Sequence, residues 1–328
     1  MDNLIFINVC PHDPYFLWQE EVLINNFRKF NISDKMEILV WYTKDSPHLI
    51  KWRNLQAKYP EVAFYFYEDE GVDLGLYIPQ LRPHTLKKHF RVHQDRLKDK
   101  VFFYHDSDIL FTYLPDFENL IKDDICWQSD TSGYLDYNYL RRKEIEGKIP
   151  ENEAVQVLAE IGNVTVGTFQ IYAGRTGGAQ CILKNIDYSY WDDVERMCLE
   201  IRRKFFWNIE GSVNHKYFPS ESAGFQSWCA DMWAVNMGLW SRGIRTDITK
   251  ELDFSWATDS LETFKKKPIY HNAGVASPSS NLFYKGSWIH KSPIGVDLPL
   301  PPEESASRQY VLAIKDIKQS TELFVIFS

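Results

Sequence analysis

Residues 100–111, KVFFYHDSDILF, join an apolar run to two aspartates that are separated by a single serine. On an extended chain Asp106 and Asp108 would face the same way, because side chains alternate along a strand. Mg²⁺ and Mn²⁺ prefer oxygen ligands, and Mg²⁺ is usually held by one or two carboxylates together with substrate phosphates. We therefore predict that residues 100–111 form a strand with a metal-binding aspartate pair; a solvated turn is the alternative.

The segments before this stretch alternate between short apolar runs and longer segments with apolar residues at helical spacing. Strands are predicted at residues 4–10, 36–43 and 62–69, and helices at 18–30, 48–59 and 85–92. Such alternation predicts an α/β fold with a mostly parallel, Rossmann-like sheet flanked by helices. Ligands of these sheets bind outside the carboxyl ends of the strands, where the aspartate pair would lie.

The second half of the chain has a mixed pattern. A strand is predicted at residues 165–173, a glycine turn leading into a helix at 176–186, and helices at 192–206 and 223–240. The last residues, 310–328, are expected to form a helix followed by a strand. A proline cluster at 299–302 marks the predicted end of the compact fold.

Composition and charge limit the classes of partner. The chain has 328 residues, which suits one large α/β domain or two small ones. Its formal charge of −8 provides no overall positive field for nucleic acid or anionic lipid. The five cysteines form no close CxxC pair, the N-terminus lacks the basic start of a signal peptide, and no apolar run reaches about 18 residues. We therefore expect a cytoplasmic protein without a membrane span.

Several segments carry a resemblance to known proteins. They are YFLWQEEVLINNFRKF (15–30), HDSDILF (105–111), TGGAQCILKNI (176–186), ADMW (230–233), YHNAG (270–274) and YKGSW (284–288). With the Asp-x-Asp triplet, they make the chain resemble the nucleotide-sugar glycosyltransferases of the GT-A fold. They are distantly similar to the plant hydroxyproline O-arabinosyltransferases and peptidyl-serine galactosyltransferases. The resemblance implies a hexosyl- or pentosyltransferase that uses Mn²⁺ or Mg²⁺ and a nucleotide-sugar donor, expected to be a UDP-sugar.

The resemblance also implies how the chain is divided. A single GT-A domain is expected over residues 1–300, with a nucleotide-binding half at 1–115 and an acceptor half at 116–300. Residues 301–328 are expected to be a C-terminal extension that packs on the body.

For the metal site, the resemblance implies that Asp108 is the main ligand and that Asp106 contacts the metal or the donor ribose. A histidine late in the chain normally completes such a site. His271 in YHNAG matches that position better than His290 in SWIHKSP. A hydrogen-bonded structural role is the alternative for either histidine.

The nucleotide-binding residues implied by the resemblance lie in two places. The backbone at the end of the first strand is expected to contact the base; its residues are Asn8, Val9 and Cys10, and His12 would assist. Cations of the segment LRPHTLKKHF are expected to pair with the diphosphate; they are Arg82, Lys87 and Lys88. For the two lysines, a solvated helix face is the alternative.

The second half supplies the residues expected to face the sugars. Gly177 and Gly178 would permit close backbone approach to a ligand, or would only form a turn, and Gln180 would reach a sugar hydroxyl. Asp231 lies among apolar and aromatic residues, where a carboxylate is costly unless it is paired or functional. We expect it to contact the transferred sugar or the acceptor; an exposed position on the helix is the alternative. Weaker acceptor candidates are Asp253 and Trp288.

The expected reaction moves a sugar to a hydroxyl-bearing acceptor, such as a glycan, a peptide or a modified base. The resembling families retain the anomeric configuration, so retention is expected; in an inverting enzyme Asp231 would instead serve as the base. Three alternatives are a non-catalytic carbohydrate-binding protein on the same fold, a metal-dependent nucleotidyltransferase and a glycosyltransferase that acts on hydroxylated DNA bases. The loop PHDPYF lacks the glycines of a nucleotidyltransferase, and the acidic charge disfavours nucleic acid without excluding it.

Overall fold

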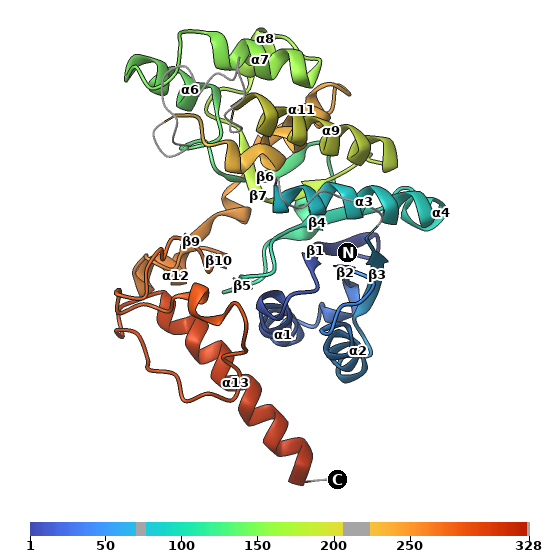
Figure 1. Cartoon of the computed structure of the whole chain (residues 1–328), viewed down its shortest axis with the longest axis vertical. Coiled ribbons are helices and arrows are strands. Elements are labelled where there is room, and N and C mark those ends of the chain that lie inside the picture. The colour runs from blue at the N-terminus through green and yellow to red at the C-terminus, as the bar shows by residue number, and fades with distance from the viewer. Residues whose placement is uncertain (70–76, 206–223, 327–328) are drawn as a thin grey trace. The chain divides into compact units, whose positions relative to one another are not determined.

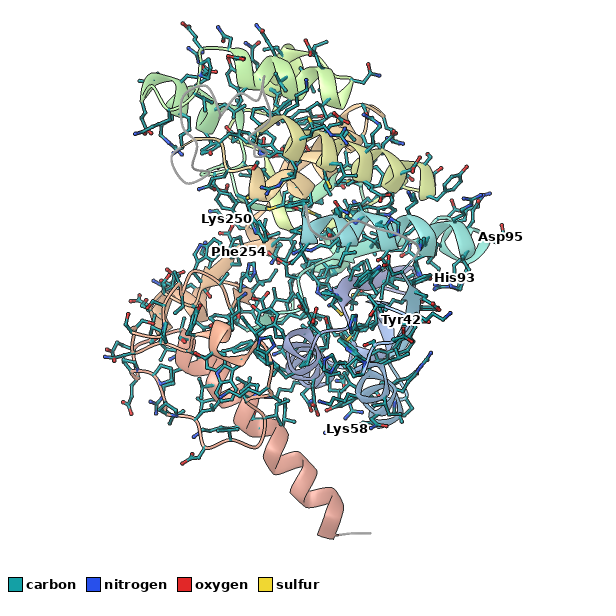
Figure 2. The ribbon with its side chains drawn as sticks, in the orientation of Figure 1. Tyr42, Lys58, His93, Asp95, Lys250 and Phe254 are labelled. Carbon is teal, nitrogen blue, oxygen red and sulfur yellow. The ribbon has the colours of Figure 1, made fainter. Side chains whose placement is uncertain are left out.

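The computed structural model describes residues 1–69, 77–205 and 224–326 (Figure 1). The chain forms two compact units, each assembled from segments that are distant in sequence. The first unit consists of Met1–Leu4, Gly71–Tyr104 and Glu118–Lys250, and the second consists of Ile5–Glu70, His105–Phe117 and Glu251–Ser328. Figure 2 labels Lys250, the last residue of the first unit, and Phe254, which begins a strand of the second.

The described strands form two sheets. The larger has the order β3-β2-β1-β4-β7-β6-β8, and its strands are β1 Leu4–Pro11, β2 Met36–Tyr42, β3 Ala63–Glu68, β4 Val101–Tyr104, β6 Cys126–Asp130, β7 Gly177–Leu183 and β8 Thr246–Ile248. The smaller has the order β5-β10-β9, with β5 Ile109–Phe111, β10 Ile269–His271 and β9 Phe254–Trp256. Strands β1, β2 and β3 are parallel, whereas β7 is antiparallel to β4 and β6. The predicted α/β class, with a mixed second half, is confirmed.

Helices account for most of the remaining described residues. The α-helices are α1 Pro14–Lys29, α2 Leu49–Lys58, α3 Leu81–Val92, α4 Gln94–Leu97, α5 Phe117–Leu120, α6 Tyr137–Ile145, α7 Glu153–Gly162, α8 Val166–Ile171, α9 Tyr188–Phe205, α11 Ala230–Trp240, α12 Leu261–Lys266 and α13 Ser307–Ile326. Short 3₁₀ turns are η1 Ser33–Lys35, η2 Ile78–Gln80, η3 Ser227–Cys229, η4 Lys250–Leu252 and η5 Lys285–Trp288. In the described part of the chain, no helix has both the length and the apolar character needed to cross a membrane.

The core of the second unit forms around α1, which begins with a proline in its first turn. One side of α1 places Phe27 against Phe111, with ring centroids 4.8 Å apart, and against the edge of Phe6. On another side, Trp18 and Val22 join a buried cluster with residues of β5, β10 and α13, including Leu110, Tyr270, Tyr310 and Ile314. Burial of these large apolar side chains ties the smaller sheet to α1 and α13.

The segment 100–111 differs from the single strand that was predicted. It forms β4 and β5, which belong to different sheets, and residues 105–108 make a turn between them. The apolar residues on both sides are buried, but the run His-Asp-Ser-Asp favours a turn over continued pairing. The aspartates therefore lie on a turn between two buried strands rather than on a strand.

Two predictions for the first unit are wrong. Residues 165–173 contain the helix α8 instead of a strand, and the Thr165 hydroxyl caps it by accepting from the Thr168 amide at 3.1 Å. Residues 177–183 form β7 instead of a helix, because Gly177 and Gly178 allow neighbours to pack directly on the strand. A Cβ atom at Gly177 would lie 2.3 Å from the Gln128 side chain, and one at Gly178 would lie 2.3 Å from that of Met232.

The C-terminal residues also differ from the prediction, since α13 continues from Ser307 to Ile326 where a helix and then a strand were expected. Tyr310, Val311 and Ile317 of α13 are buried in the cluster around Trp18. This apolar spacing is that of one helix face.

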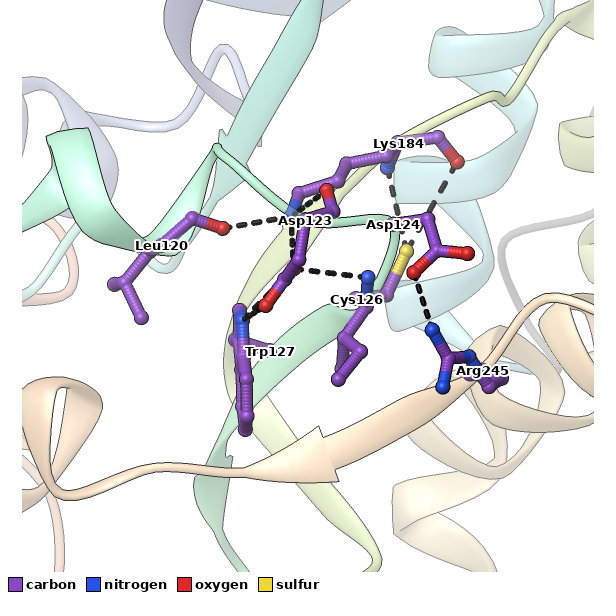
Figure 3. Close-up of polar contacts among 8 residues, drawn as sticks. Leu120, Asp123, Asp124, Cys126, Trp127, Lys184 and Arg245 are labelled. Carbon is purple, nitrogen blue, oxygen red and sulfur yellow. Dashed lines mark hydrogen bonds and ion pairs between the residues drawn. The ribbon is translucent and has the colours of Figure 1, made fainter.

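A buried lysine holds the end of β7 (Figure 3). The Lys184 ammonium donates to the carbonyl oxygens of Leu120 at 2.6 Å and Asp123 at 2.9 Å, and to the Asp123 carboxylate at 2.9 Å. The Lys184 amide donates to the Cys126 sulfur at 3.3 Å. Three oxygen partners satisfy the ammonium, which explains how a charged group remains stable there.

Candidate metal centre

Three predicted ligands come together in the second unit. Asp106 and Asp108 lie on the turn between β4 and β5, and His271 ends β10. The His271 Nε2 atom is 3.5 Å from Asp106 Oδ2 and 3.3 Å from Asp108 Oδ1. One ligand atom from each residue fits within 4.8 Å of the others. His290, the reserve candidate, is exposed and lies outside this group.

Strand pairing explains why residues so distant in sequence meet. β10 runs antiparallel to β5, with His271 opposite Ile109, the residue that follows Asp108. The backbone amide of Asn272 donates to the Asp108 carbonyl oxygen at 2.9 Å. This pairing fixes the end of β10 against the turn.

Aromatic neighbours orient the imidazole. The Trp256 ring stacks on His271 with centroids 5.6 Å apart and an interplanar angle of 18°, and Phe254 lies at 5.7 Å. The Nδ1 atom of His271 is buried without a hydrogen-bond partner among the described residues. The imidazole is held by packing, with Nε2 towards the carboxylates.

A cation already accompanies the carboxylates. The Lys285 ammonium of η5 donates to Asp108 Oδ2. Burial alone would raise the pKa of Asp108, but the adjacent Lys285 ammonium and the His271 imidazole hold it below its ordinary value. Asp108 is therefore an ionised carboxylate in a buried position. Sequence reasoning missed Lys285, although it belongs to the segment YKGSW that was singled out.

The donor set fits a divalent cation of the Mg²⁺ or Mn²⁺ kind. Two carboxylates offer hard oxygen ligands and an imidazole offers nitrogen, a combination that suits Mn²⁺ well. The ammonium beside Asp108 shows that the site stabilises positive charge. Because the protein supplies few ligands, coordination positions of the cation remain for phosphate oxygens or water.

The end of β1 lies in the interior of the second unit. The side chains of Asn8, Val9 and Cys10 are buried, and Asn8 Nδ2 donates to Glu20 Oε1 at 2.6 Å. Burial raises the pKa of Glu20 to about 8 and also raises the pKa of the Cys10 thiol. A nucleotide contact by the backbone of these residues stays a prediction.

His12 follows β1 and is half-buried. Its ring stacks with that of His48 at 6.1 Å and lies 5.9 Å from Trp41, and the Trp52 indole donates to its carbonyl oxygen at 2.7 Å. Burial lowers the pKa of His12, which favours the neutral imidazole. His48 was not singled out from the sequence, because no spacing rule links it to His12.

In the first unit, Asp231 is buried in α11 and accepts a hydrogen bond from the Tyr77 hydroxyl at 3.0 Å. Arg82 forms an ion pair with it at 3.4 Å. The alternative of an exposed helix aspartate therefore does not describe this residue. The structure brings Asp231 and Arg82 together, which the sequence did not predict, because they are far apart along the chain.

The remaining predicted residues have clear structural contacts. Gln180 is buried and its Oε1 accepts from the Ser129 hydroxyl at 2.7 Å, while its Nε2 has no hydrogen-bond partner among the described residues. Lys87 pairs with Glu195 and with Asp192 at 3.1 Å, and Lys88 is half-buried. The two weaker candidates have other partners: Asp253 pairs with Lys267 at 2.9 Å, and the Trp288 carbonyl accepts from the Trp18 indole at 3.3 Å.

Comparisons with known proteins show which solved structures have a similar fold. No protein-family model and no curated protein sequence matches the chain. Among solved structures, the fold is similar to that of the bifunctional glycosyltransferase WbbM, with a TM-score of 0.51 and 14% identity over 99% of this chain and 52% of that chain. The galactosyltransferase LgtC, in complex with donor and acceptor sugar analogues, matches with a TM-score of 0.41 and 10% identity over 95% of each chain. Core-mannan synthase A from Aspergillus fumigatus, in a Mn/GDP form, matches with a TM-score of 0.34 and 11% identity over 97% of this chain and 84% of that chain.

The likeness to WbbM confirms the predicted GT-A type of fold, and the chain spans about half of the length of that protein. The more particular resemblance to arabinosyl- and galactosyltransferase families stays a prediction.

Proposed function

We propose that this chain is a metal-dependent glycosyltransferase that moves a sugar from a nucleoside diphosphate donor, expected to be a UDP-sugar, to a hydroxyl acceptor. The observation that carries the proposal is the meeting of Asp106, Asp108 and His271 on two elements of a GT-A type of fold. In such a fold a carboxylate pair at the carboxyl end of a strand is well placed to hold a metal–diphosphate group.

The Asp106 and Asp108 carboxylates and His271 Nε2 would hold Mn²⁺ or Mg²⁺. Such a cation neutralises the charge that develops on a leaving diphosphate. Buried Asp108 stays ionised because the Lys285 ammonium lies beside it, so it is ready to act as a ligand. Trp256 fixes the imidazole plane, which limits reorganisation when the ligand atoms converge.

Lys285 adds a second cation beside the ligands. Its ammonium pairs with Asp108, and with a divalent cation on that carboxylate it would turn to the donor phosphates. A lysine is a compact point charge on a flexible stem, which suits this exchange of partners. Lys285 therefore acts as a phosphate-binding residue in our proposal.

The sugar-facing roles also remain proposals. Asp231, which pairs with Arg82, would contact the transferred sugar or the acceptor. The Gln180 amide nitrogen, which has no partner in the described part of the chain, would donate to a sugar hydroxyl. We retain Gly177 and Gly178 as a place of close backbone approach. Retention of configuration is proposed, since it does not require a separate base on the opposite face.

A panel of nucleotide sugars tests this function. With Mn²⁺, the protein should release nucleoside diphosphate from one donor, and EDTA should abolish the release. Asp108→Asn should lower the rate by roughly 10²-fold or more, whereas the control Asp297→Asn, whose side chain is 100% exposed, should match the wild type. Equal rates for the two variants would reject the proposal. Sugar binding without nucleotide release would favour the carbohydrate-binding alternative.

A further inference from the structure

A cavity of about 590 Å³ opens in the second unit between η5 and the proline-rich segment 298–302. Its size lies within the range of about 300 to 1,000 Å³ that is typical of small-molecule sites. The walls include Tyr284, Ser287 and Trp288 from η5 and its approach, and prolines from the opposite segment. None of these residues belongs to the metal centre described above.

The lining chemistry selects the kind of ligand. The residues that line this cavity in the described structure are all uncharged, which disfavours phosphates and ionic peptides. Asn281 and Ser287 are exposed, so an amide and a hydroxyl are open to a ligand. Prolines and aromatic rings supply rigid apolar walls around these groups. A neutral ligand with one apolar face and several hydroxyl groups, which is the description of a pyranose ring, complements this lining.

Tyr284 provides the flat surface for such a ring. A Cβ atom at Gly286 would lie 2.3 Å from Tyr284 Cζ, so the tyrosine ring packs directly over the glycine backbone. The far end of the ring is held there, while the side chain remains half-buried at the cavity wall. One face of Trp288 is covered by Lys291, whose Nζ lies 4.8 Å from the ring centroid. Tyr284 is therefore the better stacking platform.

The same short turn connects the cavity to the metal centre. Lys285, which contacts Asp108, lies between Tyr284 and Ser287 in sequence. A 3₁₀ turn rises only about 2 Å per residue. The residues of one cavity wall are thus neighbours in sequence of the lysine that we propose to bind the donor phosphates.

We propose that this cavity is a carbohydrate-binding subsite for the acceptor, with Tyr284 as its stacking platform and Gly286 as the residue that positions the Tyr284 ring. The subsite rests on the proposed glycosyltransferase function and specifies its acceptor class as a neutral sugar. The hydroxyls of the sugar bind Asn281 and Ser287.

Saturation-transfer NMR with the full chain tests the subsite, using the methyl glycosides of glucose, galactose, mannose and xylose as probes. At least one glycoside should bind, and Tyr284→Ala should weaken its binding by about fivefold or more, because the stacking surface is lost. Tyr284→Phe keeps the ring and should bind as the wild type does. Gly286→Ala should weaken binding in the same direction, because the added methyl displaces the ring. The matched control is Gly133→Ala, where an added Cβ meets nothing within 4 Å.

Unchanged glycoside binding in both Tyr284→Ala and Gly286→Ala would overturn the inference, as would binding of a proline-rich peptide with no glycoside bound. Melting temperatures recorded on the same samples show which variants are folded. If Tyr284→Ala does not fold, glycoside binding by Gly286→Ala decides whether the subsite exists. Manganese-dependent nucleotide release by the wild type separates the two proposals. Release without glycoside binding removes only the subsite. Glycoside binding without release removes the transferase function and, with it, the acceptor role, and leaves a carbohydrate-binding cavity.

Discussion

At the scale of single residues, Lys285 connects the electrostatics of the metal centre to its proposed chemistry. Its ammonium donates to the buried Asp108 carboxylate, on which His271 is the other ion-pair partner among the described residues. A buried charge that loses its partner is costly. The ammonium donates to Oδ2 of Asp108, and His271 Nε2 lies beside Oδ1 of the same carboxylate.

The first prediction therefore concerns Lys285→Met. We expect the free energy of unfolding to fall by roughly 1–3 kcal/mol, because Asp108 loses a buried partner. Mn²⁺ should raise the melting temperature of this variant more than that of the wild type, since the metal replaces the missing charge. Differential scanning calorimetry with and without Mn²⁺ measures both effects, and Lys266→Met, whose side chain is 70% exposed, is the control. Equal metal shifts in variant and wild type would show that Lys285 does not share the site of the cation.

The second prediction concerns Glu20, whose pKa is raised by burial to about 8 from an ordinary value of 4.5. Over that window the folded state binds more protons than the unfolded state, so stability must fall as the pH rises. The slope from this residue is at most about 1.4 kcal/mol per pH unit, and the penalty is complete only above about pH 8. Urea unfolding at several pH values should show a flatter profile for Glu20→Gln. Parallel profiles for the two proteins would show that Glu20 is not the group responsible.

At the scale of elements, the first unit holds Asp231 at the start of α11, where Tyr77 and Arg82 reach it. A carboxylate with these partners is stable without a ligand, so its burial alone does not decide between a structural and a catalytic role. The two roles differ in what the loss of its charge would change.

The third prediction is that Asp231→Asn keeps the fold and the affinity for metal and nucleotide, yet lowers sugar transfer by roughly 10²-fold or more. Thermal unfolding and single-turnover transfer should be measured on one preparation. A lower melting temperature with a normal rate per folded molecule would make Asp231 a structural residue.

Local sequence patterns predicted the elements with strong periodicity. They did not predict the segments in which contacts with neighbouring elements override the local preference. The strands β1, β2 and β3 and the helices α2 and α3 lie close to their predicted positions, because apolar runs and helical spacing are local signals. β7 was mistaken for a helix, since its glycines serve packing against Gln128 and Met232. Tertiary contacts of this kind leave no mark on the spacing of the segment itself.

The candidate site likewise combines residues that local sequence patterns reveal with contacts that only the fold creates. Asp106 and Asp108 were visible as a pair because only one residue separates them, and His271 was found through a resemblance. The pairing of β5 with β10 that brings them together is a long-range contact, as is the bond from Lys285 to Asp108. Partners such as Arg82 and Tyr77 for Asp231 likewise depend on the fold rather than on a motif.

At the scale of the whole molecule, each unit carries one group of the predicted site residues. The second unit holds the metal centre and the cavity beside η5, and the first holds Asp231, Arg82 and Gln180. The predicted division into a nucleotide-binding half at 1–115 and an acceptor half at 116–300, with an extension at 301–328, stays a proposal. The account as a whole depends on a cation bound by Asp106, Asp108 and His271.

Electron paramagnetic resonance of Mn²⁺ titrated into the protein with UDP tests that dependence most directly. The wild type should bind a single ion per chain, Asp108→Asn should lose it, and His271→Ala should weaken it by about tenfold or more, because one ligand of the three is removed. His290→Ala should bind as the wild type does. Wild-type binding by Asp108→Asn, or a larger loss in His290→Ala than in His271→Ala, would contradict the assignment of the metal centre.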